Sequence, residues 1–188
     1  MNSHYFARRV GNQGVILTPS GVLFRLNSLR SISGFSAMFK AVKTPCVGIC
    51  STGIGDTVCR GCKRFTHEVI SWNAYTHDQR RSIATRLEQF LTQVVSNKLQ
   101  VTDELLLQEQ LKHQSIRYNP DQNPYCWIND LLRAGASQVS DLAHYGLARQ
   151  QGWESESLVE IKDAIDRDYY TLSCAHFERY IAPGQVLA

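Results

Sequence analysis

The sequence lacks several features that would place it in a familiar functional class. It has no run of about 18 apolar residues, which excludes the usual membrane-spanning helix. It contains no phosphate-binding loop, no dinucleotide fingerprint and no nucleophile elbow, and its histidines form no H-E-x-x-H pair. A continuous apolar core followed by a small-residue cleavage site is also missing, so we expect no secretory signal. These absences favour a cytoplasmic protein without enzymatic activity.

Acidic residues are absent from the first 45 positions, which contain six Lys or Arg. Residues 46–100 have seven basic and four acidic residues, whereas residues 101–188 have seven basic and thirteen acidic residues. This asymmetry is more typical of two solvated surfaces of opposite sign than of a dedicated surface for an anionic partner. The excess of acid in the last segment opposes docking to a phosphate backbone, so we expect no specific binding to DNA.

Residues 1–37 show no sustained period of a helix or a strand. They are interpreted either as a flexible or transit-like basic arm, or as translated upstream sequence that precedes a natural start at Met38. We favour the second interpretation because Met38 lies just before the first organised motif. Three parts are predicted. Residues 1–37 are a disordered or non-native extension, residues 38–96 are a four-cysteine metal-binding domain that includes one helix, and residues 97–188 are a helical region.

Cysteine is plentiful and concentrated. Six cysteines are present, and four of them lie within 17 residues in the spacing C-x3-C-x8-C-x2-C. They are Cys46, Cys50, Cys59 and Cys62. Gly48 and Gly61 stand between the members of each pair, where glycine permits a tight turn. An even count can indicate disulfides, but such crowding without a secretory signal predicts one metal centre.

The identity of the metal stays open at this point. Four thiolates suit Zn(II) and also an iron–sulfur cluster. The spacing differs from both common ferredoxin patterns, which by itself leans towards structural zinc. The basic residues around the cysteines would offset the negative charge of a tetrathiolate site. These residues and those of the following helix are also the predicted partner-binding set: Arg60, Lys63, Arg64, Arg80, Arg81 and Arg86.

The segment PCVGIC…CRGCKR, followed by Glu68, Val69 and Trp72, resembles the YdhL-like bacterial family, domain of unknown function 1289. The resemblance covers residues 44–91. It implies that the same four cysteines carry an iron–sulfur cluster, because the family is labelled as predicted Fe–S proteins. The cluster and zinc are therefore both retained. Phe65 and the connector Ser51-Thr52-Gly53 depart from the commoner family pattern, but neither departure removes a ligand.

Periodic apolar residues and capping signals predict a mainly α fold, with a small four-cysteine metal knuckle followed by an all-α region. Thr66 starts a short helical turn, and Thr76 with Gln79 forms a capping box for a helix over 77–96. Asp103 caps the next helix. Four further helices are expected, over about 126–134, 138–151, 156–170 and 173–181. No useful strand alternation appears after residue 65.

Two functions are compatible with these features. The first is a non-enzymatic module in which a zinc or iron–sulfur knuckle presents a surface to a protein, or to RNA. The second is a redox or electron-transfer protein whose cysteines hold a cluster that changes oxidation state. Cys126 and Cys174 are expected to be small packed side chains rather than ligands. His67 and His77 are expected to be solvated or capping residues, because four thiolates complete a tetrahedral site.

Overall fold

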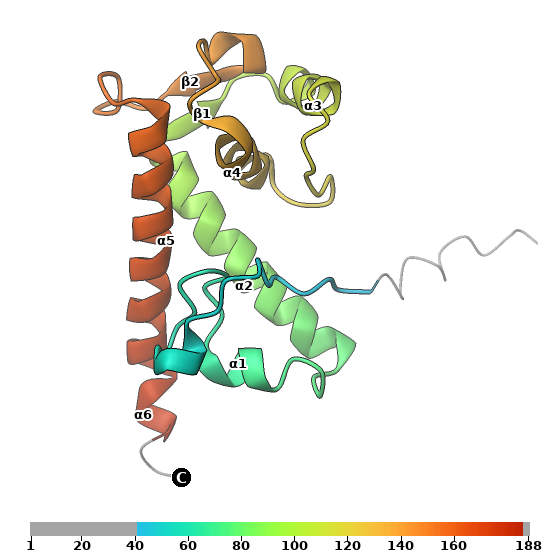
Figure 1. The fold of residues 1–188 in the computed structure, drawn as a ribbon, viewed down its shortest axis with the longest axis vertical. Coiled ribbons are helices and arrows are strands. Elements are labelled where there is room, and N and C mark those ends of the chain that lie inside the picture. The colour runs from blue at the N-terminus through green and yellow to red at the C-terminus, as the bar shows by residue number, and fades with distance from the viewer. Residues whose placement is uncertain (1–40, 186–188) are drawn as a thin grey trace, which may run out of the picture. The chain divides into compact units, whose positions relative to one another are not determined.

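The computed structural model describes residues 41–185, so the predictions for residues 1–37 and the start at Met38 lie outside the described residues. The described part is mainly helical and contains one two-stranded sheet (Figure 1). None of its helices combines the length and apolar character that a membrane crossing requires. The elements are η2 (Thr52–Ile54), α1 (Thr66–Ile70), α2 (His77–Ser96), β1 (Leu99–Val101), α3 (Glu104–His113), α4 (Pro124–Gly135), η3 (Ala143–Tyr145), β2 (Leu147–Arg149), α5 (Leu158–Tyr180) and α6 (Ala182–Gln185).

Helix α2 begins where the capping box predicts. The Thr76 hydroxyl accepts a hydrogen bond from the Gln79 amide at 3.3 Å, and the Gln79 side chain accepts one from the Thr76 amide at 2.9 Å. These bonds satisfy amide groups that have no partner inside the helix. The apolar face buries Ile83, Leu87 and Val94. Both the predicted bounds and the predicted buried face are confirmed.

Helices α3 and α4 also follow from local signals. The Asp103 carboxylate accepts a hydrogen bond from the Leu106 amide at 3.0 Å, as expected of an N-cap residue. Asn123 caps α4 through the Tyr125 amide at 3.1 Å, and Pro124 occupies the first turn, where its missing N–H costs nothing. The predicted helices in these two regions are confirmed.

The helix predicted over 138–151 is wrong. The segment forms the short η3 and then strand β2, which pairs antiparallel with β1 in the register Val101 to Leu147. Gly146 causes the difference, because its φ of 64° interrupts a helix and a Cβ at this position would lie 2.3 Å from the Asp103 carbonyl. Its own carbonyl accepts hydrogen bonds from the Thr102 and Asp103 amides, which the close approach permits.

The two helices predicted over 156–170 and 173–181 form one helix, α5, which begins after the N-cap Ser157. Neither glycine nor proline occurs between Leu158 and Tyr180, so no residue in this span favours a break. Figure 1 shows α5 as the longest helix, with α6 following its C-terminal end.

The main core lies where α2, α4 and α5 pack against one another. It combines Val94 and Val95 of α2 with Leu107 of α3, Ile128 of α4 and Ile161 of α5, all nearly inaccessible to solvent. Residues of both predicted regions, 38–96 and 97–188, thus contribute to one cluster. A smaller cluster joins the cysteine-rich segment to the C-terminal half of α5.

Candidate functional site

The second cysteine pair lies in a tight hairpin, residues 58–65, which we call the cysteine hairpin. Val58 and Phe65 form an antiparallel bridge, and the Cys59 amide donates to the Arg64 carbonyl at 2.8 Å. The Lys63 amide donates back to the Cys59 carbonyl at 2.8 Å. Lys63 has a φ of 59°, which lets the chain return after Cys62. The turn therefore holds Cys59 and Cys62 in a fixed relation.

Backbone amides converge on the sulfur of Cys59. Burial raises the pKa of this thiol, but hydrogen bonds from the backbone of Cys62, Ser51 and Gly61 outweigh burial and bring its pKa down to about 7. Amide donors favour the thiolate because they point positive dipoles at the developing charge. Cys59 itself is buried, with 1% of its surface exposed. These donors therefore make Cys59 easier to deprotonate than an ordinary buried thiol.

The sulfur of Cys62 has a cationic neighbour. Burial raises the pKa of this thiol, and a hydrogen bond from the Arg64 side chain opposes that rise in part. The Arg64 Nε donates to the Cys62 Sγ at 3.3 Å, and the guanidinium carbon lies 4.9 Å from the centre of the Trp72 ring. Because Arg64 is itself buried, its charge acts on the sulfur pair with little screening by water.

The first cysteine pair lies on the cysteine loop, residues 46–50, which rests on the hairpin. The Cys59 thiol donates to the Ile49 carbonyl at 3.6 Å. A Cβ on Gly61 would lie 2.2 Å from that carbonyl, so only glycine allows the loop to approach the hairpin this closely. The Arg60 amide donates to the Ser51 hydroxyl at 2.9 Å and fixes the chain that leaves the loop.

The sulfurs of the first pair remain at the surface. Cys46 and Cys50 are exposed, and the Cys50 Sγ lies 3.1 Å from the Thr52 hydroxyl. Among residues 41–185, no three metal-ligating side chains gather into one group. The structure thus fits a thiolate-bound metal in part: the hairpin pair is organised for it, and the loop pair lies on the neighbouring segment without converging on the same point.

The hairpin is fastened to helix α5. The buried Lys63 side chain donates to the Arg60 carbonyl at 2.6 Å and forms an ion pair with Asp166. The Phe65 ring packs against Phe177, with centroids 5.2 Å apart. One charged contact and one aromatic contact therefore hold the hairpin against residues that lie more than a hundred positions later in the chain.

A buried ion pair joins the hairpin to helices α1 and α2. The Glu68 carboxylate accepts hydrogen bonds from the Phe65 amide at 3.0 Å and from the Arg86 guanidinium at 2.6 Å. The same guanidinium lies 3.9 Å from the centre of the Phe65 ring. Because both charged groups are largely removed from water, each depends on the other for its solvation.

The six basic residues predicted to bind a partner do not form one exposed surface. Lys63 and Arg64 are buried, and only 15% of the Arg86 side chain is accessible. Arg80 is half-buried and donates to the carbonyls of Trp72 and Asn73. Arg60 and Arg81 are the exposed members.

The exposed Arg60 also has contacts within the protein. Its Nε donates to the Asp56 carboxylate at 2.8 Å, and its guanidinium lies over the Tyr170 ring. Asp166 was not foreseen as part of this region, because it lies more than a hundred positions later in the chain and meets Lys63 only when the chain folds. Asp56 was not named either, although its spacing of four residues from Arg60 is a local signal.

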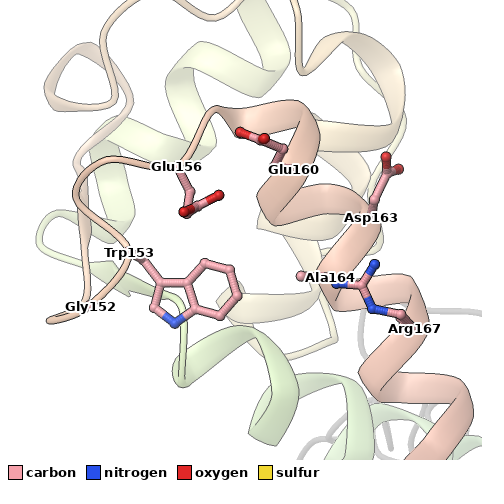
Figure 2. Close-up of a pocket in the computed structure, with 7 residues that line it drawn as sticks. All are labelled: Gly152, Trp153, Glu156, Glu160, Asp163, Ala164 and Arg167. Carbon is pink, nitrogen blue, oxygen red and sulfur yellow. The ribbon is translucent and has the colours of Figure 1, made fainter.

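An acidic hollow of about 440 Å³ lies beside the N-terminal half of α5. Figure 2 shows the Glu156 carboxylate near the indole of Trp153, with Glu160, Asp163 and Arg167 along the helix. Glu160 is engaged in the helix cap, where it accepts a hydrogen bond from the Ser157 amide at 2.9 Å. The excess of carboxylates makes this hollow unfavourable for a phosphate group.

Comparison with known proteins bears on the cysteine-rich segment alone. A search of the curated proteins and a search of the solved structures each found no match. Residues 44–91, which comprise the cysteine loop, the cysteine hairpin, α1 and most of α2, match the model of the family described as Protein of unknown function (DUF1289), and this match confirms the resemblance seen in the sequence.

Proposed function

We propose that this protein is a non-enzymatic metal-binding module whose four cysteines hold one zinc ion or one iron–sulfur cluster. The ligands are Cys46, Cys50, Cys59 and Cys62. The observation that supports the proposal is the convergence of backbone amides on the Cys59 sulfur, together with the Arg64 guanidinium beside Cys62. A buried thiol that served only for packing would not require this set of donors.

The proposal also explains how the cysteine loop is ordered. Val47 and Ile49 are exposed, so burial of apolar side chains does little to order the loop. A metal bound by both pairs would supply that ordering, because binding energy at a structural site is folding energy. Bound zinc would act as an electrostatic cross-link, whereas an iron–sulfur cluster would add one-electron redox chemistry.

A protein is the partner that the surface of this module fits better than RNA. Four large apolar side chains of the matched segment are exposed: Val47, Ile49, Ile54 and Ile70. The basic side chains that would neutralise phosphates are mostly turned inward and paired. Exposed apolar side chains can be buried against a protein partner but gain little from a phosphate backbone.

Metal analysis of the full chain tests the proposal. Protein isolated under anaerobic, reducing conditions is analysed for zinc, iron and acid-labile sulfide, alongside Cys59→Ser and the control Cys174→Ser, which alters a cysteine of α5. We expect one centre per chain in the native protein and the control, and its loss in Cys59→Ser together with a lower thermal stability. Fresh reduced material with neither zinc nor iron contradicts the proposal.

The same analysis separates the two metals and the two functions. A colourless protein with one zinc per chain eliminates the alternative of electron transfer. A brown protein with iron and sulfide supports that alternative, since amide-to-sulfur hydrogen bonds of the kind found at Cys59 tune the potential of a cluster. Reversible bleaching with a chemical reductant then distinguishes a redox centre from a structural one.

A further inference from the structure

A groove of about 780 Å³ lies between the end of α3 and the C-terminal half of α4. The segment that follows α3, residues 114–117, forms one wall, and residues 130–135 of α4 form the other. Figure 1 shows α3, α4 and the loop that joins them. The volume falls within the range of pockets that bind small organic molecules. All its lining residues lie outside the segment that matches the family model.

Polar and apolar side chains both line the groove. Leu131 belongs to the main core, and the partly buried Ile116 and Val139 pack against that core. At the rim, the Gln114 side-chain amide donates a hydrogen bond to the Tyr145 hydroxyl. Small-molecule sites combine apolar surface, which supplies affinity, with fixed polar groups, which supply orientation.

Asp130 supplies a carboxylate to this groove. The side chain is half-buried, and within the described part of the chain it makes neither a hydrogen bond nor an ion pair. Burial raises its pKa to about 6, although the charge of Arg133 acts in the opposite direction. A carboxylate in this position lacks the donors that would replace lost water, so a ligand that carries a donor would satisfy it.

Arg117 supplies a guanidinium to the same groove. It is exposed, and no acidic residue among residues 41–185 pairs with it. It follows a turn at Ser115, whose φ of 55° is uncommon for a residue with a side chain. This turn is the cap that ends α3, where the Ile116 amide donates to the Leu111 carbonyl at 2.9 Å and the Ser115 amide donates to the Lys112 carbonyl at 3.0 Å. The groove therefore presents one unpaired negative group and one unpaired positive group.

We propose that this groove binds a small amphoteric molecule of the amino-acid or short-peptide class, with its ammonium group at Asp130, its carboxylate at Arg117 and its apolar body against Ile116 and Val139. A ligand of uniform charge would meet repulsion from one of the two groups. A neutral apolar ligand would remove water from both charged groups and give neither a partner, and this desolvation costs free energy. The inference is independent of the metal centre.

Titration calorimetry on the full chain tests the proposal with the dipeptide leucyl-leucine and its N-acetyl and C-amide derivatives. We expect the free dipeptide to bind and N-acetylation to weaken binding by about tenfold, the equivalent of one lost charge-assisted pair. Asp130→Asn should weaken binding of the free dipeptide similarly and should abolish the difference between the free and acetylated forms. Arg117→Gln should weaken binding of the free dipeptide to a similar extent and should abolish the difference between the free and amidated forms.

Two variants with the same changes of charge serve as controls. Glu109→Gln and Lys112→Gln alter exposed side chains of α3 that do not line the groove, and binding should be unchanged. Circular dichroism establishes that each variant is folded. Absence of binding to the folded native protein overturns the proposal, and so does equal binding by the native protein and Asp130→Asn.

Discussion

The cysteine-rich segment and the helical region bury different kinds of side chain. Within residues 41–185, six polar or charged residues are buried, and four of them lie in a stretch of eighteen positions: Ser51, Lys63, Arg64 and Glu68. The main core formed by α2, α4 and α5 is built from Leu, Ile, Val and Trp. One region is therefore held by directional bonds between charged groups and the backbone, and the other by non-directional burial of apolar surface.

This difference affects how each region responds to substitution. An apolar core tolerates exchange of similar shapes, and the cost of a change scales with the volume removed. A network of buried charges depends on every member, because one missing partner leaves another charge without solvation. The proposed metal centre would need the second kind of interior for its charged sulfurs, and this network lies around the hairpin.

The largest effect is expected for Glu68→Gln. The amide can still accept the hydrogen bond of Phe65, but Arg86 is left buried without a counter-charge. Removal of one member of a buried pair costs about 3–5 kcal/mol. Urea unfolding measures this change, and Glu178→Gln, which alters an exposed residue of α5, is the control. Equal stability of the two variants would show that the ion pair contributes little to the hairpin.

A somewhat smaller loss is expected for Ile128→Ala in the main core. The side chain is fully buried, and truncation of such a residue costs about 2–5 kcal/mol through lost burial and a cavity. The exposed Leu105 provides the control Leu105→Ala, with a change within about 0.5 kcal/mol. Reaction of the buried Cys59 and Cys62 with a bulky thiol reagent should stay slow in Ile128→Ala under native conditions and become fast in Glu68→Gln, because only the latter opens the hairpin.

The smallest expected effect is that of Asp130→Asn, which should raise the free energy of unfolding rather than lower it. The folded state holds the Asp130 proton up to a pKa of about 6, whereas an unfolded Asp loses it near pH 4, so ionisation lowers stability as the pH rises through this window. Asn cannot ionise. We therefore expect Asp130→Asn to match the native protein at pH 3 and to exceed its free energy of unfolding by about 1–3 kcal/mol at pH 7.

Urea unfolding at a series of pH values checks this prediction. The control Asp163→Asn removes an exposed carboxylate of α5 and so separates the effect of burial from that of net charge. A gain for Asp130→Asn accompanied by loss of dipeptide binding would identify a residue retained for function at the expense of stability. A stability difference that does not vary with pH would instead show that Asp130 is fully solvated when the protein is folded.

Local signals predicted α2, α3 and α4 and the turn that holds one pair of the candidate cysteines. Thr76 with Gln79 and Asp103 are caps whose partners lie three residues away, so their interactions can be read from neighbouring letters. The Cys59-Arg-Gly-Cys62 spacing likewise predicted a tight turn that holds two sulfurs together, and residues 58–65 form that turn. In both cases the interacting groups are close in sequence, and the geometry follows from backbone bonds within one turn.

Other features could not be predicted from neighbouring residues. The helix expected around residue 146 is replaced by a strand because Gly146 contacts Asp103, more than forty positions earlier. Lys63, Arg64 and Arg86 were grouped with exposed basic residues, but they are largely buried and contact Asp166, Cys62 and Glu68, respectively. Pairing between distant charges depends on which surfaces the fold brings together. The identity of a basic residue in the sequence therefore does not show whether its side chain is paired or solvated.

The amino-acid sequence by itself determined the family match over residues 44–91, the mainly helical character and the hairpin that brings Cys59 and Cys62 together. These follow from spacing, periodicity and capping, which act over a few residues. Only the tertiary structure decided which charges are buried, how the hairpin is fastened to α5 and where Asp130 and Arg117 face a common groove. Such contacts depend on the packing of whole helices, because burial changes the cost of a charge and only the complete fold decides what is buried.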